Sequence, residues 1–401
     1  MTEQRQSYRY RPQNPHVVLP WHKELGKKIE RVNKILTLRL LGKILRIKPV
    51  TSPLPLEKVS SVLIIRYDAL GDMIVTTPLW RILKRHKPSI KIGVAGSFKN
   101  LDLLRADTDI DTLYDYTASS LRDFVRLSRQ TRKEKWDVVL MGNFNQKTRN
   151  SIISRLATTN GITATIGAKN KEGHQALFSR LVSLPETDFE MPMTEKLQFL
   201  LRSTIELPSE QFERPSIIVD PVVERETSVK IKTILEQENI TKYIVLNTDA
   251  PAFKRWGTGK NIQLASYIST HYPEYAVLMT ALPNYGKEIE LHLSSQHIPR
   301  VHYFPTDDIH AMTTLIRHSE LVVTPDTSIV HLASAENKPV VAFYLAVGEW
   351  APYDIPAYIL LPKSGEPISS IPLDSAEEGI RTMLTIGLPP GEMVRTVRCE
   401  R

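Results

Sequence analysis

The stretch VLIIRYDALGDMIVTTPLWRILKRHKP, residues 62–88, joins an apolar run to a short polar turn and an amphipathic segment. This order predicts a buried β-strand near 61–66 and a helix near 72–86, the opening unit of a nucleotide-binding sheet. The turn has one glycine, Gly71, where a dinucleotide fingerprint would have three, and the carboxylate of Asp72 follows it. The turn is therefore unsuited to holding a pyrophosphate, and its negative charge requires another explanation.

Asp72 has two interpretations that the residues leave open. Asp is a preferred N-cap residue, so Asp72 can begin the helix after Gly71 makes a tight turn. Asp72 can also be a general base that deprotonates a substrate hydroxyl, with Asp68 as a second carboxylate in the same turn. Pro78 lies too deep for a helix begun at Asp72, so we expect a kink there or a new helix with Thr77 as its cap.

Apolar strands alternate with helices twice along the chain, which predicts an α/β fold with two parallel sheets. The first set of expected strands is 61–66, 90–95, 112–116, 136–142 and 163–167, with helices near 72–86, 97–105, 118–133 and 148–158. The second set is 243–247, 275–280, 320–324 and 339–344, with helices near 259–271, 285–296, 308–318 and 328–337.

We expect a basic N-terminal extension and linker at 1–57 and two Rossmann-like domains at 58–215 and 216–401. A more irregular segment, 185–240, with several prolines and helical pieces, joins the two domains. Ligands of such sheets bind outside the carboxyl ends of the strands, so the cleft between the domains is the expected site.

Composition narrows the function classes. The chain has 401 residues with a net charge of +8, and residues 1–60 alone carry 13 Lys and Arg against 4 Glu. The remainder is close to neutral, which argues against a nucleic-acid-binding protein. The single cysteine, Cys399, excludes a disulfide framework and suits a reducing compartment such as the cytoplasm. The sequence lacks the motifs of dehydrogenases, P-loop enzymes, zinc proteases and nucleophile-elbow hydrolases.

Residues 21–48 form a basic amphipathic segment. Apolar residues recur there at helical spacing, and Lys and Arg occupy many of the other positions. Such a helix is typical of segments that lie on an anionic membrane surface, and it can also pack on the body of its own protein. We expect a helix and leave both partners open.

The stretch TPDTSIVHLASA, residues 324–335, runs directly from an expected strand into an expected helix. Asp326, Thr327 and Ser328 lie at the helix start, where free backbone N–H groups favour phosphate. His331 follows one turn later and can donate to the same phosphate, or it can be a partly buried helix histidine. This stretch is therefore a candidate phosphate site.

Two further loops carry charge. In NTDAPAFKRWG, residues 247–257, Lys254 and Arg255 supply positive charge after a strand, although such a pair is also common on solvated loops. In DTDIDT, residues 107–112, three aspartates alternate. This pattern does not match a calcium-binding loop, and we expect a polar turn ahead of a strand rather than a metal site.

At these residues the chain resembles glycosyltransferase family 9, the lipopolysaccharide heptosyltransferases, from about residue 60 to the end of the second domain. The family opens with a strand, a Gly-Asp turn and a Thr-Pro helix. Its second domain has a Lys-Arg-Trp loop, an Asp-Thr-Gly signature followed by His-Leu-Ala-Ala-Ala, and a Lys-Pro-Val-Val-Ala strand. The matching segments are Leu63–Arg66, Gly71-Asp72, Thr77-Pro78, Lys254–Trp256, Asp326–Ser328, His331–Ala335, Lys338–Ala342 and Trp350–Tyr353.

The resemblance implies a GT-B architecture and an inverting sugar transfer that needs no metal or other cofactor. The donor would be a nucleotide sugar, usually ADP-heptose, held by the C-terminal domain. The acceptor would be a lipopolysaccharide core held by the N-terminal domain. Such an enzyme would lie in the cytoplasm, peripheral to the inner membrane of a Gram-negative bacterium.

The resemblance also assigns roles to residues. Asp72 would be the general base, and Lys254 would neutralise the departing diphosphate. Gly71 and Asp68 would lie on the acceptor side or support it. The residues expected to bind the donor are Arg255, Asp326, Thr327, Ser328 and His331.

Two residues depart from the family pattern. Ser328 stands where the glycine of Asp-Thr-Gly is usual, and Gly257 replaces the proline usual after Lys-Arg-Trp. Both lie on the donor side. They leave open a family relative that uses another nucleotide sugar for a different surface glycan. A nucleotide-binding protein of the same fold without activity is a further alternative, against which the presence of both Asp72 and Lys254 argues.

Overall fold

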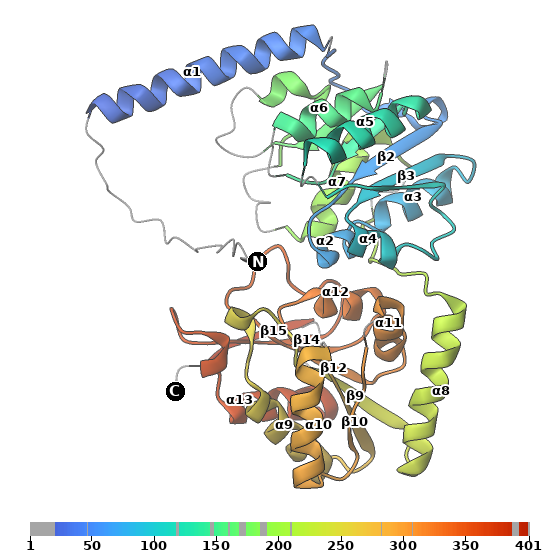
Figure 1. Ribbon diagram of the computed structural model, residues 1–401, viewed down its shortest axis with the longest axis vertical. Coiled ribbons are helices and arrows are strands. Elements are labelled where there is room, and N and C mark those ends of the chain that lie inside the picture. Colours follow the sequence, from blue (N-terminus) through green and yellow to red (C-terminus); the bar gives the residue numbers. More distant parts are fainter. Residues whose placement is uncertain are drawn as a thin grey trace.

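The chain folds into two α/β halves stacked one above the other, with helix α1 beside the upper half (Figure 1). The computed structural model describes residues 21–45, 47–117, 120–144, 148–158, 161–167, 174–184, 191–208, 211–281, 283–306, 308–386 and 393–399. Residues 1–20 of the expected basic extension and the first two residues of the helix expected at 118–133 lie outside these ranges.

Six parallel strands form the sheet of the N-terminal half, in the order β4-β3-β2-β5-β6-β7. This is the strand order of a dinucleotide-binding sheet, in which the first strand lies in the centre and the order reverses beside it. The strands are β2 (Ser61–Ile65), β3 (Lys91–Gly96), β4 (Thr112–Asp115), β5 (Val138–Met141), β6 (Ile162–Ile166) and β7 (Arg180–Val182).

Both faces of this sheet are covered because β2 is apolar on both sides. Leu63 and Ile65 join a core with α1, α5 and α6, whereas Val62 and Ile64 join a core with α2, α3 and α7. The helices of this half are α1 (Trp21–Ile44), α2 (Leu70–Ile74), α3 (Pro78–His86), α4 (Phe98–Leu103), α5 (Leu121–Glu134), α6 (Thr148–Leu156) and α7 (Met193–Thr204), with short 3-10 turns η1 (Leu56–Lys58) and η2 (His174–Leu177).

Seven parallel strands form the sheet of the C-terminal half, in the order β11-β10-β9-β12-β13-β14-β15. The order repeats that of the first sheet and adds one strand at the edge. The strands are β9 (Lys242–Asn247), β10 (Tyr275–Thr280), β11 (Val301–Tyr303), β12 (Leu321–Pro325), β13 (Val340–Phe343), β14 (Ala357–Leu361) and β15 (Val394–Arg398).

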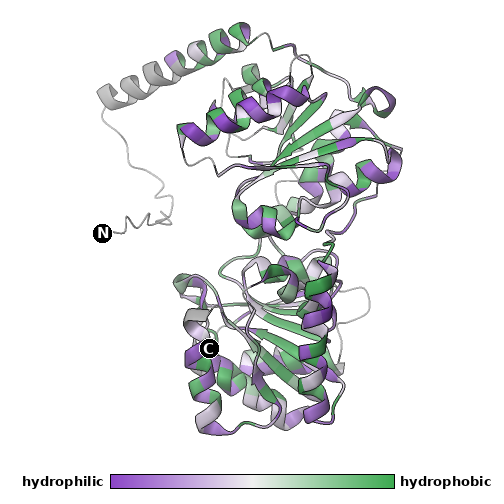
Figure 2. Ribbon diagram, turned by 45° about the vertical axis from the view of Figure 1, so that its right-hand side comes forward, coloured by the Kyte–Doolittle hydropathy of each residue, from purple (hydrophilic) through white to green (hydrophobic). Residues whose placement is uncertain are grey.

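Helices cover this second sheet on both faces as well, and the strands are the most uniformly hydrophobic elements of both halves (Figure 2). A small parallel pair, β1 (Leu54–Pro55) with β8 (Ile205–Glu206), ties the linker to the end of α7. The remaining elements are α8 (Pro221–Gln237), α9 (Thr258–His271), α10 (Pro283–Gln296), α11 (Ile309–Arg317), α12 (Ser328–Ala335) and α13 (Leu373–Arg381), with 3-10 turns η4 (Ala252–Lys254) and η5 (Ile368–Ser370) and the π-helical turn η6 (Thr382–Ile386).

The expected α/β fold with two Rossmann-like sheets is confirmed, and each of the nine expected strands is present with its bounds shifted by two residues or fewer. Six strands were missed, namely β1, β7, β8, β11, β14 and β15. The segment 185–240 was expected to contain helical pieces, and it contains the 12-residue α7 and the 17-residue α8.

The helix expected at 72–86 is two helices, because α2 ends at Ile74 and α3 begins at Pro78. The new start at Pro78 was one of the two expected outcomes. Thr77 is the N-cap residue of α3, but its side chain accepts no hydrogen bond from the helix. Its hydroxyl donates instead to the carbonyl of Ile74 at 2.9 Å. Asp72 is not the N-cap residue of α2, which is Ala69, but the third residue of the helix. Its carboxylate still caps the helix start, because it accepts the backbone N–H of Ala69.

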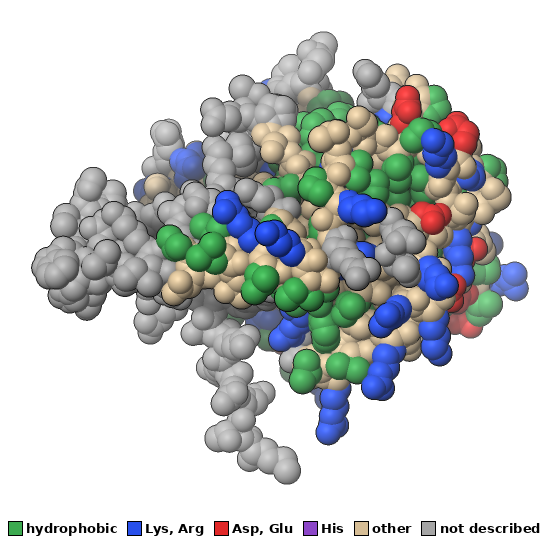
Figure 3. All heavy atoms as spheres, turned by 90° about the horizontal axis from the view of Figure 1, so that it is seen from above, with side chains coloured by type: hydrophobic (Ala, Val, Ile, Leu, Met, Phe, Trp, Pro, Cys, Tyr) green, Lys and Arg blue, Asp and Glu red, His purple; other side chains and the backbone are tan. Residues whose placement is uncertain are grey.

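The helix expected within 21–48 is present as α1, and its described part packs on the protein. Leu38 is buried in the core that α1 shares with η2, and Gly42 lies against Ala176. Figure 3 looks down on the face of the molecule that carries this helix. Among the described residues, no helix has both the length and the apolar character needed to cross a membrane.

The two halves contact each other through several elements. Helix α2 lies beside α12. The Nε2 atom of His310 on α11 lies 2.9 Å from the carbonyl oxygen of Asp102 on α4, and Arg105 pairs with Asp308 at 2.7 Å. These contacts bring the loops at the carboxyl ends of the strands of both sheets together.

A candidate active site between the two halves

Three strand-end loops converge where the halves meet. The loop after β2 contributes Asp72, the loop after β9 contributes Lys254, and the loop after β12 contributes Asp326. They line one cavity of about 380 Å³. A second cavity of about 790 Å³ lies next to it and shares four lining residues, Leu70, Pro251, Thr327 and Ser328. The sequence expectation of a cleft at the carboxyl ends of both sheets agrees with this arrangement.

Asp72 is held by both of its carboxylate oxygens. Oδ2 accepts the backbone N–H of Ala69 at 2.9 Å, and Oδ1 pairs with the guanidinium of Arg66. A carboxylate has about four acceptor positions, so two bonds fix its orientation and leave room for a substrate hydroxyl. The side chain is 14% exposed, and its exposed part faces the smaller cavity.

Arg66 is a buried cation that the sequence reasoning did not select as a site residue. Besides Asp72, it donates to the carbonyl of Gly142. Its Cζ lies 5.8 Å from the ring of Phe144 and 5.9 Å from that of Trp350, which comes from the other half. Arg66 directly follows β2, and this position at a strand end is the sequence feature that could have identified it as a site residue. The pairing itself depends on how α2 turns back toward the strand.

Gly71 does not make the expected tight turn, because it lies inside α2 and not in the left-handed region. A glycine is needed at this position for a steric reason. A Cβ built on Gly71 would lie 2.6 Å from Cδ2 of His331, closer than real contacts allow. Gly71 therefore permits α2 and α12 to approach each other across the site.

His331 is a buried, neutral imidazole. Burial, with a smaller contribution from Lys254, lowers its pKa to about 4, against the opposite effect of Asp326 and Asp72. The ring meets Trp350 edge-on at 5.9 Å, and its Nδ1 has no hydrogen-bond partner among the described residues. His331 lines the smaller cavity, so the expected donor to phosphate would carry one N–H and no positive charge.

Lys254 and Asp326 form an ion pair across the cavity. The Nζ atom of Lys254 lies 2.6 Å from Oδ2 of Asp326 and 3.2 Å from its carbonyl oxygen. Lys254 was expected to neutralise the departing diphosphate and Asp326 to bind the donor, and the structure pairs the two side chains. A phosphate entering here would have to share Lys254 with this carboxylate or displace it.

Arg255 lines only the larger cavity, whereas Lys254 lines only the smaller one. The guanidinium of Arg255 stacks on Tyr285 at 3.6 Å and donates to the carbonyl of Ala250 at 2.8 Å. Gly257 follows with φ +117°, a backbone conformation closed to proline. The loop therefore differs in backbone as well as sequence from the Lys-Arg-Trp-Pro pattern.

The start of α12 faces both cavities. Thr327 is its N-cap, and the hydroxyl accepts the N–H of Ile329 at 3.3 Å. Ser328 is the first residue of the helix and lines both cavities. Backbone N–H groups at a helix start favour an anion, as the sequence predicted for this stretch.

The larger cavity has polar residues that sequence reasoning missed. Asn247 donates to Thr324 at 2.9 Å and to the carbonyl of Asp249 at 3.1 Å, which fixes the end of β9. Burial raises the pKa of Asp249, against the effect of nearby Arg255. The sequence could have identified Asn247 and Asp249 only by their place in the loop 247–257 that follows β9. Lining residues also come from the other half, including Phe98, Lys99 and Asp102.

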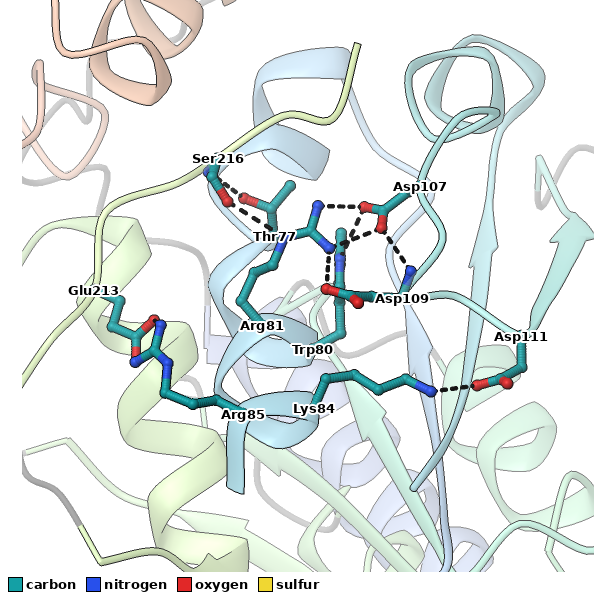
Figure 4. A network of polar contacts seen from close by, with 10 residues as sticks. All are labelled: Thr77, Trp80, Arg81, Lys84, Arg85, Asp107, Asp109, Asp111, Glu213 and Ser216. Atoms are coloured by element: carbon teal, nitrogen blue, oxygen red, sulfur yellow. Dashed lines mark hydrogen bonds and ion pairs between the residues drawn. The ribbon is translucent and has the colours of Figure 1, made fainter. Parts of the chain in front are cut away.

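Two expectations concern carboxylates outside the cavities. Asp68 lines neither cavity, and its carbonyl accepts from Asn100 at 3.3 Å. The aspartates of 107–112 are bound by basic residues of α3 (Figure 4). Arg81 binds both Asp107 and Asp109, and Lys84 pairs with Asp111. The described residues contain no His, Cys, Asp and Glu cluster with the arrangement of a metal site.

Comparisons with known proteins agree with this geometry. Residues 124–360 match the model of the family described as glycosyltransferase family 9 (heptosyltransferase). A candidate glycosyltransferase of Haemophilus influenzae is 24% identical over 71% of this chain and 82% of its own length. A shorter match, 31% identical over 77 residues, covers 19% of this chain and 20% of candidate lipopolysaccharide heptosyltransferase 4 of Escherichia coli.

Solved structures share the fold at low sequence identity. The family 9 glycosyl transferase of Veillonella parvula has a TM-score of 0.65 at 16% identity, covering 82% of this chain and 98% of its own. Escherichia coli ADP-heptose heptosyltransferase II has a TM-score of 0.63 at 17% identity, covering 81% and 98%. Escherichia coli heptosyltransferase WaaC with ADP has a TM-score of 0.61 at 13% identity, covering 80% and 97%. These likenesses identify the two-sheet arrangement as the GT-B fold.

Proposed function

This chain belongs to glycosyltransferase family 9, and we propose that it transfers a heptose from ADP-heptose to a lipopolysaccharide core, with inversion at the sugar. One observation carries the proposal. Asp72 from one half and Lys254 from the other line the same cavity between the sheets. A sugar transfer by single displacement needs a base for the acceptor and a charge for the leaving group.

In the proposed reaction, Asp72 takes the proton of the acceptor hydroxyl. The hydroxyl oxygen then forms a bond to the anomeric carbon from the side opposite the nucleotide. The bond between that carbon and the diphosphate oxygen breaks, and the nucleoside diphosphate leaves with the bonding electrons. Arg66 and the N–H of Ala69 hold the Asp72 carboxylate in the orientation that this step requires.

The leaving diphosphate would be stabilised by the C-terminal half. Lys254 supplies positive charge, and the N-terminus of α12 supplies backbone N–H groups beside Thr327 and Ser328. The proposed reaction needs no metal ion, because these groups would stabilise the negative charge that develops on the diphosphate. The neutral His331 would contribute a hydrogen bond rather than a charge.

The larger cavity is proposed to hold the nucleoside. It shares Thr327 and Ser328 with the phosphate region. Its lining includes Arg255 stacked on Tyr285, Asn247 and Asp249. The names of the relatives support ADP-heptose as donor and a lipopolysaccharide as acceptor. A lipopolysaccharide acceptor would place the reaction at the cytoplasmic side of the inner membrane of a Gram-negative bacterium.

A second candidate is a transfer from a different nucleotide sugar. It is favoured by Ser328 at the helix start and by the φ of +117° at Gly257, both beside the donor region. The experiment is a thermal-shift titration with ADP-heptose and with GDP-, UDP- and dTDP-sugars, followed by a transfer assay on core-truncated lipopolysaccharide.

We expect ADP-heptose to raise the melting temperature most and to give a product heavier by one heptose. Stabilisation by UDP-sugars alone would exclude the heptose donor and favour the second candidate. Stabilisation by nucleotides without transfer to any acceptor tested would favour a binding protein instead.

A further inference from the structure

Helix α1 has apolar residues on two different sides. On the inner side, Leu38 is 3% exposed and packs with Leu177 and Phe178 in the core of the N-terminal half. Gly42 approaches η2 so closely that a Cβ there would lie 2.2 Å from the carbonyl oxygen of Ala176. This side therefore fixes the helix to the body of the protein.

The outer side of α1 carries a second apolar stripe, Val32, Leu36, Leu40 and Ile44, in steps of four residues. These side chains are 54%, 56%, 60% and 67% exposed. Residues four apart lie above one another on a helix, so they form one continuous row. A row of large apolar side chains exposed in this way indicates an interaction surface rather than a structural need.

Basic residues accompany the stripe. Arg39 and Lys43 are exposed on the same stretch of helix. Over residues 21–48 the sequence contains nine Lys and Arg against two Glu. An apolar row combined with positive charge is typical of helices that lie in the interface of an anionic bilayer.

Helix α5 extends this surface. It lies in the same layer over the N-terminal sheet, because α1 contacts η2, η2 contacts α6, and α6 contacts α5. Its outer side exposes Leu121 at 74% together with Arg122, Arg126 and Arg129. On this face Lys, Arg and hydrophobic side chains cover much of the described area, and Asp and Glu gather toward one edge (Figure 3).

We propose that the outer sides of α1 and α5 form a docking surface for an anionic lipid bilayer. The apolar row would enter the interface while the arginines contact lipid phosphates. A second copy of the chain fits less well, because two strongly basic surfaces would face each other. The proposal does not depend on sugar transfer, since it concerns lipid binding by a surface outside both cavities.

The test uses the full chain and vesicles that contain no glycosyl acceptor. Sedimentation with vesicles of phosphatidylcholine alone is compared with vesicles that also contain phosphatidylglycerol, at low and high salt. We expect binding to the anionic vesicles only, weakening as salt rises. Binding that is equal for both vesicle types, or absent for both, would overturn the proposal.

Two variants separate the apolar and charged contributions. Replacing Val32, Leu36, Leu40 and Ile44 by Ser is expected to weaken binding to anionic vesicles at least about a hundredfold. Replacing Arg122, Arg126 and Arg129 by Gln is expected to weaken it by about a hundredfold at low salt and to flatten the salt dependence. Neither set touches the cavities, so the thermal shift caused by nucleotides should stay unchanged.

A matched control removes apolar surface of the same kind elsewhere. Val222 and Val229 on α8 and Leu291 on α10 are 60%, 59% and 72% exposed in the C-terminal half, and their Ser variants should bind vesicles as the wild type does. Light scattering is measured alongside. If the α1 variant turns a dimer into a monomer and leaves vesicle binding intact, the stripe is a protein interface and the proposal is wrong.

Discussion

At the scale of single residues, Gly71 is a point of close approach between the two halves in the site. Its hydrogen atom occupies the place where any Cβ would meet the ring of His331 at 2.6 Å. The two residues of the Gly-Asp pair therefore have different roles. Gly71 allows α2 and α12 to pack closely, and Asp72 presents a carboxylate that Arg66 and Ala69 hold in place.

The variant Gly71→Ala is expected to destabilise the protein by about 1–3 kcal/mol and to lower transfer activity, because α2 and α12 must separate. Urea unfolding and initial rates measure both effects. The matched control is Gly259→Ala on α9, where an added Cβ would meet nothing within 4 Å. If the two variants behave alike, close packing does not explain Gly71.

His331 links stability to pH at the centre of the site. Burial lowers its pKa in the folded protein to about 4, against about 6.5 in the unfolded chain. Between these values the unfolded chain binds a proton that the folded protein does not. The stability contributed by the neutral ring is present above about pH 6.5 and is lost as the pH falls toward 4.

We therefore expect the wild type to lose about 2 kcal/mol more stability between pH 7 and pH 5 than the variant His331→Asn. The measurement is urea unfolding at both pH values. His271→Asn, at an exposed position on α9, is the control and should keep the wild-type slope. Parallel profiles for wild type and His331→Asn would show that the buried ring does not resist protonation.

The sequence predicted which residues belong to the site more reliably than how they pair. Asp72, Lys254 and Asp326 were identified because each follows an apolar strand, and strand ends meet at one edge of a parallel sheet. The pairs Arg66–Asp72 and Lys254–Asp326 were not predicted. They depend on side-chain directions in turns, and periodicity contains no information about these.

At the scale of elements, α3 is fastened by charged and polar contacts on two sides, to Asp107, Asp109 and Asp111 on one and to Glu213 on the other (Figure 4). Arg81 binds Asp107 and Asp109, and Trp80 donates to Asp107 at 3.0 Å. One turn further, Arg85 pairs with Glu213. The bonds of Arg81 and Trp80 connect α3 to the turn 107–112, which leads into β4.

The variant Arg81→Met is expected to destabilise the protein by about 3–5 kcal/mol, because the carboxylate of Asp107 is only 2% exposed and would lose its partner. Thermal or urea unfolding measures the loss. In contrast, Arg85→Met removes an arginine that is 61% exposed and should cost less than about 1 kcal/mol. Equal losses would mean that the buried pair of Arg81 and Asp107 contributes no more than a surface pair.

Element prediction succeeded for most of the long apolar runs and failed for short ones, and it also missed β14, a fully buried strand of five residues. β2 and β10 were recognised from uninterrupted apolar runs. β7 and β11 have three residues each and lie at or next to sheet edges, so their sequence pattern is too brief to separate from loop. β15 has a burial pattern of alternating exposed and half-buried residues, without an apolar core of its own.

At the scale of the whole molecule, the two sheets place a carboxylate and a cation on facing walls of one cavity. Contacts such as His310 with Asp102 and Arg105 with Asp308 hold the halves in this relation. α1 lies outside this arrangement, on the far side of the N-terminal sheet from α2 and α3. The proposed chemistry, between the halves, is therefore spatially separate from the proposed membrane surface on α1 and α5.

The measurement that tests the central claim most directly is the transfer rate of Asp72→Asn beside Asp68→Asn, with nucleotide binding measured for both. Asp68 lies in the same turn but lines neither cavity. We predict that Asp72→Asn lowers kcat by about a thousandfold with nucleotide affinity nearly unchanged, and that Asp68→Asn stays within a few-fold of the wild type. Transfer by Asp72→Asn at the wild-type rate would contradict the account.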